Sequence, residues 1–151
     1  MNYEVVNLEE KKVVGVTDRM KNSDPDMIMK MSALWSKLHN EGIYASINNK
    51  ANYKAIGMYS DYESDVNSEY STTVGCEVNS FDDIPEGTVT KIIPKGKYAK
   101  FIIRGHMQKA VADFWEDFWK MDLDRNYKCD FEEYQNADVE NAEIHIYISI
   151  N

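Results

Sequence analysis

The sequence predicts an α+β fold in which a strand-strand-helix-strand-strand module occurs twice. Three observations predict it: short β-rich segments, two amphipathic helical stretches far apart in the chain, and the same order of elements in residues 1–79 and 88–151. The short connections favour antiparallel hairpins, because a parallel crossover needs a dozen or more residues. We therefore expect a single domain over residues 1–151, an antiparallel sheet with two main helices around a central cleft between the two copies.

The first copy opens with a predicted hairpin. Residues 3–8 and 12–17 are rich in residues that favour strands, and three polar residues separate them. Asp24 suits the N-cap of a helix and Pro25 its first position, while Gly42 suits the helix end. Between them, apolar side chains follow at helical spacing: Met27, Ile28, Met31, Leu34, Trp35 and Leu38.

A polar, Asn-rich stretch then predicts a loop over residues 45–53, followed by strands over 55–62 and 70–78. A connection that contains proline and glycine, residues 79–87, links the two copies.

The second copy repeats the order of the first. Strands are predicted over residues 88–93 and 97–104 as a second hairpin, then a helix over 107–121, then strands near 129–135 and 143–150. The last strand carries isoleucine at every second position, so one of its faces is apolar. The apolar face of the helix consists of Met107, Ala110, Val111, Phe114, Trp115, Phe118 and Trp119.

Composition excludes several classes of function. The chain has 17 Lys plus Arg and 26 Asp plus Glu, a net charge of −9, which argues against nucleic acid or an anionic membrane as a direct partner. Neither a signal-peptide pattern nor an apolar run long enough to span a membrane is present, so we expect a cytoplasmic protein.

The sequence also lacks the signatures of common catalytic and metal sites. Cys76 and Cys129 form no CxxC pair, the three histidines are scattered, and the GxSxG, GxGxxG and HExxH patterns are absent. We expect no metal and no cofactor, and the balance favours a protein that is not an enzyme.

Aromatic residues and one carboxylate point to a candidate binding site. The chain has ten tyrosines, and an aromatic cavity with a carboxylate suits a flat or cationic organic ligand. On a strand, Glu132 and Tyr134 share one face, and the equivalent positions in the first copy are Gly57 and Tyr59. The alternative is that the rings are core residues and that Glu132 is simply solvated.

Several segments together resemble the GyrI-like family, also known as the effector-binding domain of AraC-type and BmrR-type bacterial transcription activators. The resemblance lies in Lys12–Val16 with Leu34-Trp35, in Tyr70–Val78, in Ile84–Gly87, in Ile93–Ala99 ("I-P-x-G-x-Y-A") and in Phe131–Tyr134 ("F-E-x-Y"). It implies that Glu132 meets a cationic or polar ligand in the cleft, with Tyr134 and Tyr59 beside it. It further suggests Trp35, Trp119, Tyr98 and Phe101 as candidates for the cleft walls.

Three functions remain open at this point. The first, which we favour, is a standalone small-molecule-binding protein for a cationic or amphipathic aromatic ligand. The second, implied by hydrolases that resemble this family, is opening of cyclopropanoid rings with Glu132 as general base. The third is an acidic inhibitor that binds a protein partner such as DNA gyrase, through the clusters at residues 61–65 and 82–86.

Overall fold

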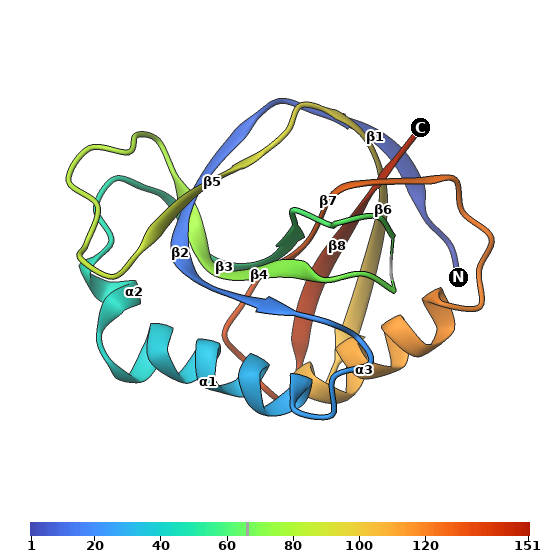
Figure 1. The fold of residues 1–151 in the computed structure, drawn as a ribbon, viewed down its shortest axis with the longest axis horizontal. Coiled ribbons are helices and arrows are strands. Elements are labelled where there is room, and N and C mark those ends of the chain that lie inside the picture. Colours follow the sequence, from blue (N-terminus) through green and yellow to red (C-terminus); the bar gives the residue numbers. More distant parts are fainter. Residues whose placement is uncertain (66) are drawn as a thin grey trace.

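The computed structural model describes residues 1–65 and 67–151, and these form one curled, antiparallel, eight-stranded sheet with three helices. The two long helices lie on the same face of the sheet (Figure 1). The expected α+β fold is therefore confirmed. The elements are β1 (Glu4–Leu8), β2 (Lys11–Met20), α1 (Met27–Asn40), α2 (Ile43–Ser46), β3 (Lys50–Ser60), β4 (Tyr70–Val78), β5 (Val89–Ile93), β6 (Gly96–Gly105), α3 (Met107–Phe118), β7 (Arg125–Tyr134) and β8 (Ala142–Ile150).

The strand order is symmetric about the centre of the sheet. It runs β1-β6-β8-β7-β3-β4-β2-β5, so β7 and β3 meet in the middle and β1 and β5 form the two edges. At the centre, Gly57 on β3 lies opposite Glu132 on β7. The boundary between the two copies of the module is therefore a continuous antiparallel ladder.

The two predicted hairpins are wrong. β1 pairs with β6, where Val6 lies opposite Tyr98, and β5 pairs with β2, where Val13 lies opposite Lys91. Each copy thus gives its first strand to the other copy. Two-residue hairpin turns need residues with positive φ, and neither Glu9-Glu10 nor Pro94-Lys95 provides one.

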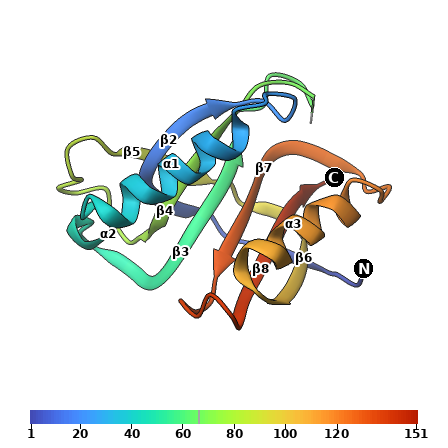
Figure 2. The ribbon, with the colours of Figure 1, turned by 90° about the horizontal axis from the view of Figure 1, so that it is seen from below.

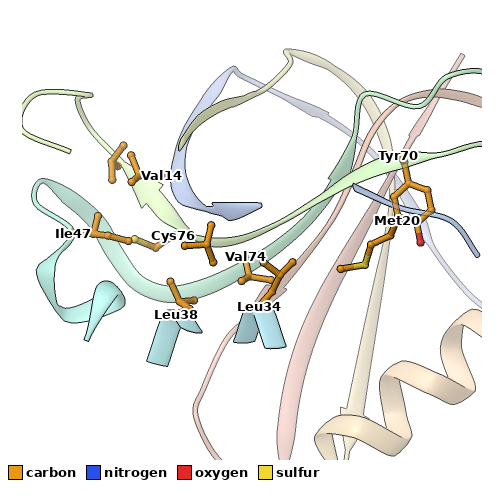
Figure 3. Close-up of a cluster of buried hydrophobic side chains, with 10 residues drawn as sticks. Val14, Met20, Leu34, Leu38, Ile47, Tyr70, Val74 and Cys76 are labelled. Atoms are coloured by element: carbon orange, nitrogen blue, oxygen red, sulfur yellow. The ribbon is translucent and has the colours of Figure 1, made fainter. Parts of the chain in front are cut away.

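Each long helix packs on its own half of the sheet. Leu34 and Leu38 of α1 contact a cluster of apolar side chains from β2 and β4 (Figure 3). Phe114 and Phe118 of α3 pack against Phe101 and the isoleucine face of β8. Between the helices, β3 and β7 run side by side without a helix over them (Figure 2). The central strands thus present their side chains to the space between α1 and α3.

The opposite face of the sheet has a core of its own. Phe131 stacks on Tyr147, and Tyr98 packs edge-on against Phe131. Val6 and Leu8 from β1 pack against this cluster, which places side chains of the exchanged strand over the centre of the sheet. One face therefore carries the helices, and the other is closed by the curl of the sheet.

Some predicted boundaries differ from those observed. The predicted loop over residues 45–53 instead contains the end of α2 and the start of β3 at Lys50. Helix α1 begins at Met27 rather than at Pro25, helix α3 ends at Phe118, and β7 begins at Arg125, well before the predicted residue 129. The early start of β7 reflects an irregularity in its pairing with β8, which shifts register between Arg125 and Asp130.

Candidate functional site

A buried carboxylate lies at the centre of the face that carries the helices. The Glu132 side chain belongs to β7 and is 2% exposed. Opposite it on β3 is Gly57, where an added Cβ would lie 3.4 Å from Glu132 Oε1. Because glycine has no side chain, the Glu132 carboxylate can occupy the space above Gly57.

Three neutral groups donate hydrogen bonds to this carboxylate. The hydroxyl of Tyr59 and the indole nitrogen of Trp115 donate to Oε2 of Glu132 at 2.8 and 2.9 Å, and the hydroxyl of Tyr134 donates to Oε1 at 2.8 Å. In the described part of the chain Glu132 forms no ion pair. The carboxylate is therefore hydrogen-bonded on both oxygens but has no counter-ion.

Burial has a clear electrostatic consequence for this cluster. Loss of water raises the pKa of Glu132, and the three hydrogen bonds oppose that rise only in part. Burial and the neighbouring carboxylate together raise the pKa of Tyr59 and of Tyr134 well above the ordinary tyrosine value. Both hydroxyls therefore keep their protons and act as donors.

Aromatic rings from both helices surround the carboxylate. The Trp35 ring from α1 lies edge-on to Tyr134 at 5.4 Å, and an added Cβ at Gly57 would lie 3.3 Å from its Cζ2. The Trp115 ring from α3 lies edge-on to Tyr59 at 5.7 Å. Four rings, two from the strands and two from the helices, therefore border Glu132, and the faces of such rings attract cations.

A second buried carboxylate lies two residues earlier on the same face of β7. Asp130 is 0% exposed, and its Oδ2 accepts hydrogen bonds from Arg125 Nη2 at 2.6 Å and from the Tyr62 hydroxyl at 2.7 Å. Its Oδ1 accepts the backbone N–H of Ser149 at 3.0 Å. Unlike Glu132, Asp130 has a cation beside it.

Residues 4–150 match the model of a family described as Cass2, integron-associated effector binding protein. The chain belongs to this family. The resemblance to effector-binding domains found in the sequence therefore holds at the level of the domain family.

Similar proteins agree with this assignment. The "Putative transcriptional regulator protein YobU" of Bacillus subtilis (strain 168) is 31% identical over 154 residues, covering 97% of this chain and 96% of that protein. The crystal structure of integron cassette protein VCH_CASS2, from the mobile metagenome of Vibrio cholerae, has a TM-score of 0.80 at 25% identity over 99% of this chain and 95% of that one. The structure of SAV2435 bound to tetraphenylphosphonium has a TM-score of 0.79 at 17% identity and covers 100% of this chain and 94% of that one. At this identity the similarity is one of fold alone.

The structure brings together four of the seven residues predicted for the site: Glu132, Tyr134, Tyr59 and Trp35. It places the other three elsewhere. Trp119 follows the last residue of α3 and is 55% exposed. Phe101 is buried beneath α3, and Tyr98 is buried on the opposite face, where its hydroxyl donates to the carbonyl of Pro94.

Trp115, a donor to Glu132, was not among the predicted site residues. Its signal was present in the sequence: Leu34-Trp35 with Leu38 and Phe114-Trp115 with Phe118 have the same spacing. Aligning the two helices on these residues pairs Trp35 with Trp115 rather than with Trp119.

The acidic surface segment near the end of β3 is partly neutralised by basic side chains. In the acidic cluster at residues 61–65, Asp61 pairs with Lys91 at 2.6 Å and Glu63 with Arg19 at 3.9 Å, so this surface is less negative than its sequence suggests. Among the described residues, no group of three or more His, Cys, Asp or Glu side chains is placed to hold a metal ion. No helix in the described chain has the length and apolar character to cross a membrane.

Proposed function

We propose that this protein binds a small organic cation, aromatic or amphipathic in character, beside Glu132. The observation that carries the proposal is a carboxylate that is 2% exposed, has three neutral hydrogen-bond donors and has no counter-ion among the residues that the structure describes. A buried charge without an opposite charge is unfavourable, so a cation placed against Glu132 would relieve that cost. The family description as effector-binding supports a small molecule as the ligand.

The rings that border Glu132 support the aromatic character of the ligand. Trp35 and Trp115 come from opposite helices, and each contacts a tyrosine that donates to the carboxylate. Ring faces attract a cation and also pack against apolar surface, which suits a lipophilic cation better than a strongly hydrated one. SAV2435, which shares the fold, was solved with tetraphenylphosphonium, a ligand of this kind. The sequence motifs support a further proposal, that the domain groups with the AraC-type and BmrR-type effector-binding domains. We also propose that the protein is cytoplasmic.

Glu132→Gln tests the proposal. Tetraphenylphosphonium and the neutral triphenylphosphine oxide are titrated separately, with tryptophan fluorescence as the readout because Trp35 and Trp115 border the site. We expect the variant to bind the cation at least roughly ten-fold more weakly, the size of one lost charge pair, and to bind the neutral compound unchanged. Equal losses for both compounds, or no loss for either, would contradict the proposal.

Glu133→Gln provides a matched control. Glu133 is the next residue on β7 and is also buried, but it faces the other side of the sheet, where Gln135 donates to its carboxylate at 2.8 Å. The same change of charge at this position should leave the affinity for tetraphenylphosphonium as it is in the unmodified protein.

A further inference from the structure

We propose that Arg125 sets the charge preference of this site: by neutralising Asp130, it makes the protein favour ligands with one positive charge over ligands with two. The inference rests on the proposed function, because it assumes that a cation binds beside Glu132.

The two buried carboxylates belong to one surface. Asp130 and Glu132 are two residues apart on β7, so their side chains leave the same face about 6.6 Å apart along the strand. Tyr59 connects them: it lies opposite Asp130 in the ladder, and its hydroxyl donates to Glu132. Tyr70 contacts both Tyr59 and Tyr62, and Tyr62 donates to Asp130. A cation at either carboxylate would therefore contact the same group of rings.

Arg125 takes the position that a second ligand cation would need. Its guanidinium lies 2.6 Å from the Asp130 carboxylate, 4.4 Å above the ring of Tyr127 and 5.3 Å above the ring of Phe118. A carboxylate with two ring faces is the environment that suits an aromatic or quaternary cation. Here a side chain of the protein itself provides the cation.

An irregular stretch of β7 brings the Arg125 side chain close to Asp130. The ladder between β7 and β8 shifts register between Arg125 and Asp130, and Tyr127 within the irregular stretch has a φ of 56°. The Arg125 side chain is only 9% exposed, and its Nε has no hydrogen-bond partner among the described residues. An unpaired buried N–H is costly, so packing alone does not account for an arginine here.

The formal charges of the site predict how Arg125 and Asp130 act together on a ligand beside Glu132. Counted as formal charges with every carboxylate ionised, Asp130, Glu132 and Arg125 sum to −1. Arg125→Met leaves two carboxylates and a sum of −2, whereas Asp130→Asn leaves one carboxylate and one guanidinium and a sum of 0. The double variant Arg125→Met with Asp130→Asn returns the sum to −1 and is the matched control.

Ethidium and propidium are suitable probes, because they share one aromatic ring system and propidium carries a second, quaternary ammonium charge. Their affinities are measured by titration calorimetry for the full chain and the three variants, with circular dichroism to verify folding. We expect Arg125→Met to raise the ratio of propidium to ethidium affinity by roughly ten- to thirty-fold, the effect of one charge at about 8 Å and an effective dielectric constant of about 20. Asp130→Asn should lower that ratio, and the double variant should restore it.

An unchanged ratio in folded Arg125→Met and Asp130→Asn would overturn the inference. If Arg125→Met does not fold, Asp130→Asn decides the question, because its amide oxygen can still accept from Arg125 and Tyr62, and its amide nitrogen can donate to the Ser149 hydroxyl in exchange for the lost bond from the Ser149 N–H. Failure of the proposed function would look different: ethidium binding would then be insensitive to Glu132→Gln. Loss of binding in Glu132→Gln together with an unchanged ratio would refute only the role of Arg125.

Discussion

The burial of Glu132 predicts an unusual dependence of stability on pH in the ligand-free protein. Burial raises the pKa of Glu132 from its ordinary value of 4.5, so the folded protein holds this proton at pH values where the unfolded chain has lost it. The free energy of unfolding therefore contains a contribution that is fully present below pH 4.5 and is lost as the pH rises through the folded-state pKa. Most buried, ion-paired carboxylates have the opposite effect.

Glu132→Gln removes this contribution and indicates its size. The amide oxygen can occupy the place of Oε2 and accept from Tyr59 and Trp115, while the amide nitrogen can donate to the hydroxyl oxygen of Tyr134. Three hydrogen bonds then remain without a buried charge, the one with Tyr134 in the reverse direction. At pH 8 we expect the variant to be more stable than the unmodified protein, by about 1.4 kcal/mol for each unit by which the pKa is raised.

Urea denaturation of both proteins between pH 4 and pH 8, followed by tryptophan fluorescence, measures this difference. Only the difference between the two proteins is interpreted, because other carboxylates also titrate below pH 5. We expect the two free energies of unfolding to converge near pH 4 and to separate as the pH rises. A variant that is less stable at pH 8, or a difference that does not vary with pH, would refute the reasoning about burial.

Two further substitutions probe the surroundings of Glu132. Trp115→Phe removes a donor to a buried carboxylate, so urea denaturation at neutral pH should show a free energy of unfolding lower by about 1.5–3 kcal/mol. Trp119→Phe is the control: it lies at the exposed end of α3 and should change the free energy of unfolding by less than about 0.5 kcal/mol. Gly57→Ala places a Cβ 3.3 Å from Trp35 and 3.4 Å from Glu132, so the Trp35 ring must shift, and titration should show weaker tetraphenylphosphonium binding with folding intact.

The sequence was informative where the structure depends on local periodicity. Alternation along β7 places Glu132 and Tyr134 on one face, and the equivalence of the two copies relates them to Gly57 and Tyr59. The structure brings Glu132 together with both tyrosines, because strand direction and pleat are enough to determine which side chains share a face. The likeness to effector-binding domains came from motifs spread along the whole chain.

Long-range pairing could not be predicted in the same way. A hairpin and an exchange of edge strands bury the same side chains of β1 and β5, so the local pattern does not distinguish them. Trp115 and Trp119 are four residues apart on one helical face, and only the end of α3 at Phe118 separates their environments. Contact between Arg125 and Asp130 depends on an irregular stretch of β7 that no periodic pattern reveals.

The most direct measurement is the position of a bound cation. Crystals grown with tetraphenylarsonium, which has the shape and charge of tetraphenylphosphonium, locate the arsenic atom by its anomalous scattering. We predict an arsenic peak beside the Glu132 carboxylate and within about 6 Å of the ring of Trp35 or Trp115, and a clearly lower occupancy there in crystals of Glu132→Gln grown at the same concentration of the cation. An arsenic atom away from Glu132, or equal occupancy in the two proteins, would contradict the central claim.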